Sequence, residues 1–238
     1  MVFSHCKLAV VSSLYLWERK KSTNCPTSFS LCKLSGVLTC LGELTIGGCP
    51  KLVSFPNLGF PPMRRRLDIF YCEGLRSLPD WMMLMKDGSN NSSDVRLLEY
   101  LKIKKCPSLI CFPEGQLPTT LKQLHISDCE NLKSLPEGMI HHNSIGINNL
   151  EYFSIRMCPS LIGFPEGELP TTLKELKIWR CEKLGSLPGG MMHHDSNTTT
   201  ATSGGLHVLN IWECPSLIFF PTGKFPSTLK KLEIRDCA

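Results

Sequence analysis

One apolar motif recurs eight times along the chain and constrains the fold more than any other feature. Aligned on its cysteine, the motif reads L-x-x-L-x-I-x-x-C-x-x-L-x-x-[LF]-P. Self-similarity at a period of a few tens of residues is typical of a solenoid, in which each repeat forms one coil and packs only against its neighbours. The sequence therefore predicts a stack of about eight coils over residues 41–238. The motif cysteines are Cys49, Cys72, Cys106, Cys129, Cys158, Cys181, Cys214 and Cys237.

The coils alternate between two types. Successive motif cysteines are separated by 23, 34, 23, 29, 23, 33 and 23 residues, which gives a super-repeat of 57, 52 and 56 residues. One type reads CPSLIxFPEGxLPTTLK and the other reads CExLxSLPxGM. Duplication of a two-coil unit explains both the spacing and the wording.

Each part of the motif has a structural reason. The last two apolar residues of L-x-x-L-x-I lie two positions apart, so a strand points both side chains to the same face. Stacked coils place these strands in one parallel sheet, and the proline that ends the motif turns the chain away from it. The polar segments between some coils are typical of surface loops. The predicted fold is an α/β solenoid, a right-handed superhelix with a parallel concave sheet and a mostly irregular or short-helical convex side.

The thirteen cysteines allow three interpretations: packing thiols, disulfides or a metal site. The motif cysteines would stack one above another, and parallel side chains rarely meet the torsion that a disulfide needs. No C-x-x-C pair occurs, so a zinc site lacks its usual ligand spacing. We expect buried thiols that fill space and donate weakly to backbone carbonyl groups, which favours a reducing compartment.

The outward positions of each strand are the candidate binding residues. The repeating scaffold carries varied side chains there, and Trp, Tyr and Arg dominate interface hot spots. Exposed Phe70, Trp179 and Trp212 favour a recognition surface over simple solvation of the sheet. The predicted partner-binding residues on the concave face are Phe70, Tyr100, Lys102, Lys104, His125, Tyr152, Arg156, Lys177, Trp179, Trp212 and Arg235.

The two ends of the chain depart from the repeat. Residues 1–40 show no repeat register, and they could be a degenerate N-terminal cap, a disordered leader or a misassigned exon. The apolar run at residues 8–17 weakly resembles a secretory signal, but no small-residue cleavage site follows it. The chain ends one residue after Cys237 without a polar capping repeat, which indicates a truncated C-terminus.

Other functional classes find little support. The net charge of +5 is scattered, and the single dense basic run, Arg64–Arg66, does not indicate a nucleic-acid partner. No apolar run is long enough to cross a membrane. His141–His142 and His193–His194 are interpreted as loop residues, and no catalytic, nucleotide-binding or small-molecule site stands out. We expect no enzyme activity, no metal and no cofactor. Asn90, Asn91 and Asn197 begin N-x-[ST] triplets that would matter only in a secreted protein.

The wording of the repeat resembles a known family. The phrases CPSLIxFPEGxLPTTLK and CExLxSLP, with I-x-x-C in place of an asparagine, resemble the leucine-rich-repeat domain of plant coiled-coil-type nucleotide-binding disease-resistance proteins. The resemblance covers residues 41–238. It implies an intracellular, cytoplasmic immune receptor whose repeats sense a pathogen effector or a guarded host protein and hold a nucleotide switch closed. The coiled coil and the nucleotide-binding domain of that family are missing here.

The resemblance leaves rival interpretations open. A protein partner is expected in each of them. The chain could instead be an extracellular receptor ectodomain, a stand-alone adaptor or decoy fragment, or a substrate-recruiting subunit of a ubiquitin ligase.

Overall fold

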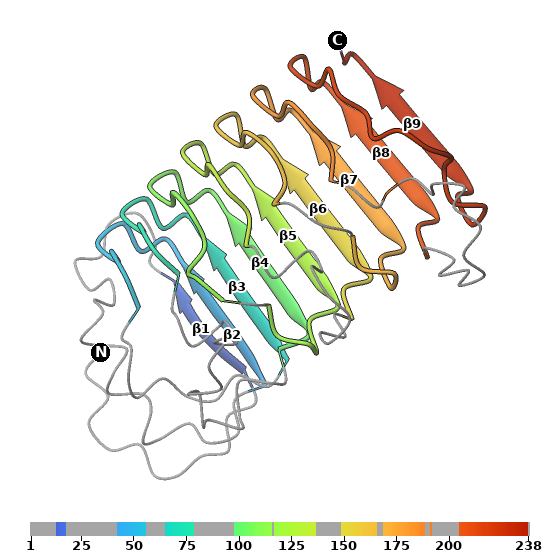
Figure 1. Ribbon diagram of the computed structural model, residues 1–238. Coiled ribbons are helices and arrows are strands. Elements are labelled where there is room, and N and C mark those ends of the chain that lie inside the picture. Colours follow the sequence, from blue (N-terminus) through green and yellow to red (C-terminus); the bar gives the residue numbers. More distant parts are fainter. Residues whose placement is uncertain are drawn as a thin grey trace, which may run out of the picture.

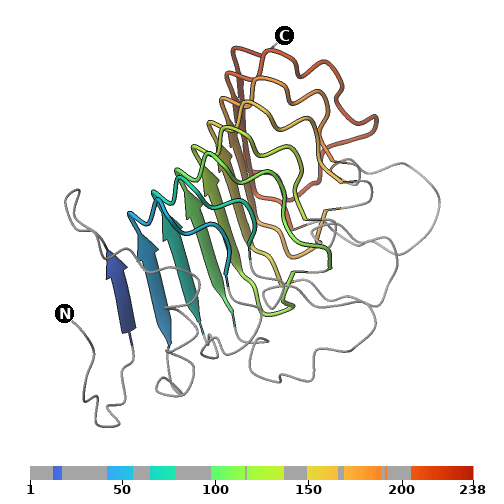
Figure 2. The same cartoon turned by 90° about the vertical axis from the view of Figure 1, so that its left-hand side faces the viewer.

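The described residues form one open sheet of nine parallel strands in chain order (Figure 1). The computed structural model describes residues 13–17, 42–55, 65–78, 98–115, 117–136, 149–165, 169–188, 191 and 205–237. The strands are β1 (Ser13–Trp17), β2 (Glu43–Gly47), β3 (Arg66–Phe70), β4 (Tyr100–Lys104), β5 (Gln123–Ser127), β6 (Tyr152–Arg156), β7 (Glu175–Trp179), β8 (Val208–Trp212) and β9 (Lys231–Arg235). In the view of Figure 2 the strands stand along one side and the connecting segments lie on the other.

Strands β2 to β9 coincide with the eight predicted L-x-I positions, and their register follows the motif. Leu44 pairs with Leu67, Ile46 pairs with Ile69, and equivalent motif residues pair at every step up to β9. Every motif position therefore forms a column that runs across the sheet. The predicted leucine-rich-repeat solenoid is confirmed.

Strand β1 lies in the segment for which the sequence predicted no repeat. It pairs parallel to β2 with Leu14 opposite Leu44 and Leu16 opposite Ile46. The two-residue alternation of a strand is thus retained, but the rest of the motif is not. Arg19 and Ser22 stand where the motif has its cysteine and the following leucine, which is why alignment on cysteine missed this strand.

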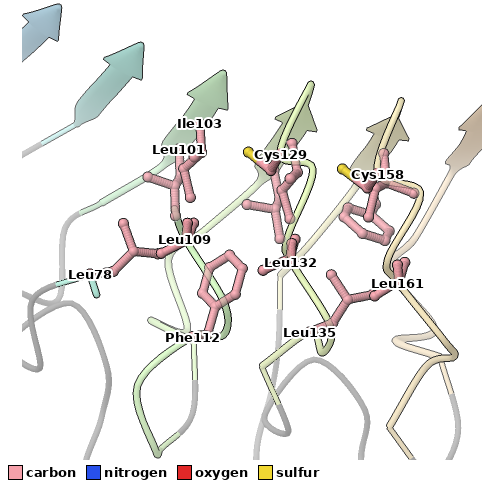
Figure 3. Packing of buried hydrophobic residues seen from close by; sticks show 14 of the residues in the cluster. Leu78, Leu101, Ile103, Leu109, Phe112, Cys129, Leu132, Leu135, Cys158 and Leu161 are labelled. Carbon is pink, nitrogen blue, oxygen red and sulfur yellow. The ribbon is translucent and has the colours of Figure 1, made fainter. Parts of the chain in front are cut away.

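The core consists of the inward columns, which pack coil on coil (Figure 3). Leu101 and Ile103 of β4 are fully buried, and Leu109 and Phe112 of the same coil close the core from behind. Full burial of one such side chain contributes about 1.5–3 kcal/mol. Because each coil buries its apolar side against the next, neighbouring coils stabilise one another.

The motif cysteine begins a tight turn behind each strand. In each coil from β2 to β8 the N–H of the motif leucine three residues later donates to the carbonyl of this cysteine at 3.1–3.2 Å. Its buried thiol donates in turn to the carbonyl two residues earlier, at 3.3–3.7 Å. The predicted thiol–carbonyl contact is confirmed, and all nine cysteines among the described residues carry free thiols.

A left-handed residue ends each of these strands, a feature that the sequence did not predict. The residue before the motif cysteine has φ between 51° and 64° in every coil from β2 to β9. From β2 to β8 its N–H donates at 2.8–3.0 Å to the carbonyl of the last residue in the next strand. The left-handed turn thus extends the hydrogen-bond ladder by one residue beyond the sheet. These residues are Gly48, Tyr71, Lys105, Asp128, Met157, Arg180, Glu213 and Asp236.

Turns, and no helices, connect the strands within the described residues. The phrase P-[ST]-T-L-K forms one of these turns. Thr120 donates from its hydroxyl to the carbonyl of Leu98 at 3.0 Å, and equivalent bonds recur at Thr172 and Thr228. The described part of the chain contains no helix with the length and hydrophobicity of a membrane span.

Candidate binding surface

The sheet face is the surface formed by the outward residues of β2–β9, on the side away from the core columns. The eleven predicted partner-binding residues all belong to strands β3–β9, at positions that alternate with the buried leucine and isoleucine. Three columns run across this face because the register is preserved. The strand's first, middle and last residues form the first, central and third columns.

A ladder of rings and cations crosses five strands of the sheet face. The ring centroid of His125 lies 5.0 Å from that of Tyr100 and 4.7 Å from that of Tyr152. The guanidinium carbon of Arg66 lies 3.9 Å from the Tyr100 ring centroid at one end, and the Lys177 Nζ lies 5.0 Å from that of Tyr152 at the other. Cation–π contacts of this kind contribute about 0.5–2 kcal/mol each. Five side chains from β3–β7 therefore form one preordered surface.

His125 lies at the centre of this ladder in a desolvated, positive environment. Its Nε2 is buried and has no hydrogen-bond partner among the described residues. Burial, followed by the charges of Lys102, Arg156 and Arg66, lowers the pKa of His125 to about 4. The imidazole is therefore neutral at pH 7, and the ladder is held by ring packing rather than by a charged histidine.

A second cluster surrounds Trp179 at the end of β7. The indole Nε1 donates to the Glu213 carboxylate at 2.9 Å, and Arg180 forms a salt bridge with the same carboxylate. Hydrogen bonds from Trp179 and then from Arg180 lower the pKa of Glu213. The guanidinium groups of Arg156 and Arg180 lie 6.0 and 5.5 Å from the Trp179 ring centroid. These contacts fix the orientation of the indole.

Strand β8 carries two buried polar atoms without partners. Neither Nε1 of Trp212 nor Oδ1 of Asn210 has a hydrogen-bond partner among the described residues. The guanidinium of Arg235 lies 5.5 Å from the Trp212 ring centroid. Leaving a buried polar atom unpaired costs about 1–3 kcal/mol, so these atoms are unusual in a surface that serves stability alone.

The prediction that Phe70, Trp179 and Trp212 are exposed is wrong in degree, because all three side chains are half-buried. The in-register neighbours cover one side of each ring. The Phe70 ring lies over Gly47, where an added Cβ would stand 2.3 Å from the ring. Each ring is therefore already packed along the sheet before any partner arrives.

The middle of the sheet face is positively charged. Arg66 pairs with Asp68 at 2.7 Å and Lys177 pairs with Glu175 at 2.7 Å. Lys102, Lys104 and Arg156, on β4 and β6, form no salt bridge within the described part of the chain. The surface thus combines aromatic anchors with unneutralised cations.

Sequence reasoning missed several members of these clusters. Arg66 precedes the first leucine of its strand, in the column from which only the two tyrosines were singled out. Arg180 and Glu213 belong to the left-handed column, which was not considered because no sequence signal marks a positive φ in a non-glycine residue. The alternating strand pattern found the columns, but it could not show which side chains touch.

Other sequence candidates fall outside the described residues: His141, His142, His193, His194, Arg64, Asn90, Asn91 and Asn197. Among the residues that are described, no group of His, Cys, Asp and Glu could hold a metal ion.

Comparison with known proteins places this chain beside plant disease-resistance proteins. It is 36% identical over 150 residues to the disease resistance protein At3g14460 of Arabidopsis thaliana, covering 63% of this chain and 9% of that protein. It is 29% identical over 197 residues to the disease resistance RPP13-like protein 1 of the same plant, covering 78% and 17%. The chain thus spans less than a fifth of either relative, and no family profile matches it.

A solved structure also resembles this chain. The leucine-rich-repeat domain of the type III effector XopL aligns with a TM-score of 0.47 and 21% identity, over 82% of this chain and 68% of that one.

Proposed function

We propose that this chain, a leucine-rich-repeat solenoid homologous to plant disease-resistance proteins, is the protein-binding domain of an innate immune receptor and binds its partner on the sheet face. The partner would be a pathogen effector or a host protein that the receptor guards. The observation that carries the proposal is the continuous ladder Arg66–Tyr100–His125–Tyr152–Lys177, together with the Trp179 cluster beside it.

The ordering of these side chains supports binding in energetic terms. A free surface side chain loses about 0.5–1.5 kcal/mol of conformational freedom when a partner immobilises it. Trp179 is already held by Glu213 and by two guanidinium groups, so most of that loss has occurred before binding. Preordered aromatic anchors are the residues that dominate interface energies.

The proposal includes an intracellular location and no catalytic role. Free thiols in every coil from β2 to β9 are the form that a reducing compartment maintains. The aromatic and cationic side chains of the sheet face contact one another across strands rather than lining a substrate pocket, which favours a macromolecular partner.

The proposal can be tested by screening candidate effectors and host proteins for pairwise interaction with the 238-residue chain. A partner found with the unsubstituted chain is then measured against Trp179→Ala/Trp212→Ala. Loss of these two aromatic anchors is expected to weaken binding by at least about tenfold.

The matched control is Ile162→Ala/Ile218→Ala. These side chains are 64% and 65% exposed, and they follow the motif leucines outside the sheet. We expect this variant to bind within about twofold of the unsubstituted chain. A partner that is lost with the isoleucine variant and retained with the tryptophan variant would exclude the sheet face.

A further inference from the structure

A groove runs along the rim of the solenoid, next to the carboxyl ends of the strands, and adjoins the sheet face at Arg180 and Glu213. It has a volume of about 620 Å³ and follows the coils of β5 to β9. The left-handed residues line it in every one of these coils, and the residue after the motif cysteine lines it in the coils of β5 to β8. The left-handed column of the groove is Asp128, Met157, Arg180, Glu213 and Asp236, and the column that follows the cysteines is Glu130, Pro159, Glu182 and Pro215.

The repeat itself produces the groove. The left-handed turn fixes the left-handed column, because the N–H groups of this column from Asp128 to Glu213 bond to the next strand at 2.8–3.0 Å. The column that follows the cysteines alternates between glutamate and proline, since the two coil types begin CP and CE. The groove is therefore a fixed feature of the backbone with a chemical period of two coils.

The lining combines apolar contacts with strong negative charge. Met157, Pro159 and Pro215 offer apolar surface, and Met157 is 38% exposed. Five carboxylates face a single guanidinium, Arg180, which already pairs with Glu213. The other four, Asp128, Glu130, Glu182 and Asp236, form no salt bridge with any residue that the structure describes. The groove thus complements a positively charged ligand.

The spacing of the carboxylates selects the form of that ligand. Glu130 and Glu182 are two coils apart, which is about 10 Å at the usual spacing of strands. A polyproline II segment has three residues per turn and advances about 3.1 Å per residue, so every third side chain points to the same side at intervals of about 9 Å. Pro159, between the two glutamates, and Pro215, in the coil after Glu182, can pack against the methylene groups of Lys or Arg.

We propose that this rim groove binds a segment of a partner protein in the polyproline II conformation that carries arginine or lysine at every third residue. The segment runs across the coils, its cations reach the carboxylates of alternate coils, and its intervening residues contact Met157 and the prolines. This groove adjoins the sheet face, because Arg180 and Glu213 also contact Trp179, but the proposal does not depend on the sheet face binding a partner.

The test uses two synthetic peptides of about nine residues and equal composition. One carries arginine at every third position with Pro-Ala between, and the other carries its three arginines side by side. Fluorescence anisotropy with the 238-residue chain at low salt is expected to show at least about tenfold tighter binding of the spaced peptide.

Two double variants then locate the site. Glu130→Gln/Glu182→Gln is expected to weaken binding of the spaced peptide at least about tenfold. The matched control, Glu99→Gln/Glu151→Gln, removes the same charge at the same two-coil spacing, from carboxylates that pair with Lys122 and Lys174 and do not line the groove. Its binding should stay within about twofold.

Three results would overturn the proposal. The spaced peptide does not bind, both peptides bind equally, or both double variants weaken binding to the same degree. The last two would show attraction by net charge without a site. Circular dichroism of each variant verifies that the exposed substitutions leave the fold intact.

Discussion

The left-handed residue in each coil from β2 to β9 is the clearest case of backbone strain among the described residues. Seven of these eight positions carry a side chain, although only Gly48 adopts a positive φ without steric cost. For an L-residue this conformation costs about 1–2 kcal/mol. Met157 gives the cleanest test, because its side chain is partly exposed and its φ is 51°.

We expect Met157→Gly to be more stable than Met157→Ala by about 1 kcal/mol. Both substitutions remove the side chain beyond Cβ, so the comparison isolates the backbone conformation from the packing of the methionine. This difference is what remains after the greater flexibility of glycine in the unfolded chain has reduced the gain by about 0.5 kcal/mol or more. Urea unfolding of the two variants measures the difference. An alanine variant as stable as the glycine variant would show that the turn is unstrained.

His125 makes the stability of the chain depend on pH. Its pKa in the folded chain is about 4, below the value of about 6.5 in an unfolded chain. A depressed pKa means that the stabilisation is complete above about pH 6.5 and is lost as the pH falls toward 4. Because the imidazole is partly exposed, we expect a loss of only about 1–2 kcal/mol after solvent screening.

The comparison variant is His125→Gln, which cannot titrate in this range. Its free energy of unfolding should change less between pH 7 and pH 4.5 than that of the unsubstituted chain. Asp68 opposes the shift, whereas Lys102, Arg156 and Arg66 reinforce it. Equal pH dependence of the two proteins would exclude His125 as the source.

At the scale of the strand, the sequence was sufficient to predict β2–β9 and insufficient to predict β1 or the side-chain contacts between strands. The eight L-x-I positions predicted β2–β9, because a two-residue alternation aligned on a recurring cysteine allows only one register. Strand β1 was missed because Arg19 and Ser22 replace the motif cysteine and the leucine that follows it in the sequence. The contacts around Trp179 depend on Glu213, which lies 34 residues away in the chain, so no local pattern could predict them.

Strand β6 contains the largest fully buried side chain of the described residues, Phe153. It occupies a column in which its neighbours are Leu124 and Leu176, and its ring packs edge-on against Phe164 at 6.1 Å. Phe153→Ala should destabilise the chain by about 3–5 kcal/mol through the cavity that it leaves. Phe153→Leu restores the residue type of the column and should cost about 1–2 kcal/mol.

Urea unfolding of both variants gives these two values. If leucine cost as much as alanine, the column would require an aromatic ring at β6, and the motif position would not be interchangeable between coils.

At the scale of the whole molecule, stability is distributed along the stack. The contacts between strands that hold the sheet together join consecutive neighbours. Such a solenoid behaves as a one-dimensional array in which each coil depends on the coils beside it. A coil with neighbours on both sides therefore opens less readily than a coil with one.

Hydrogen exchange measures this gradient directly. On β9 the core residues Leu232 and Ile234 are 43% and 41% exposed, whereas Leu176 and Ile178 of β7 are buried. We expect backbone amides of β5–β7 to be protected most and those of β9 least, because local opening of β9 exposes little additional apolar surface. Leu232→Glu should therefore leave the protection of β5–β7 unchanged, whereas Leu176→Glu should abolish it. Uniform protection from β5 to β9 would mean that the coils unfold as one cooperative unit, and a charge at Leu232 would then destabilise every strand.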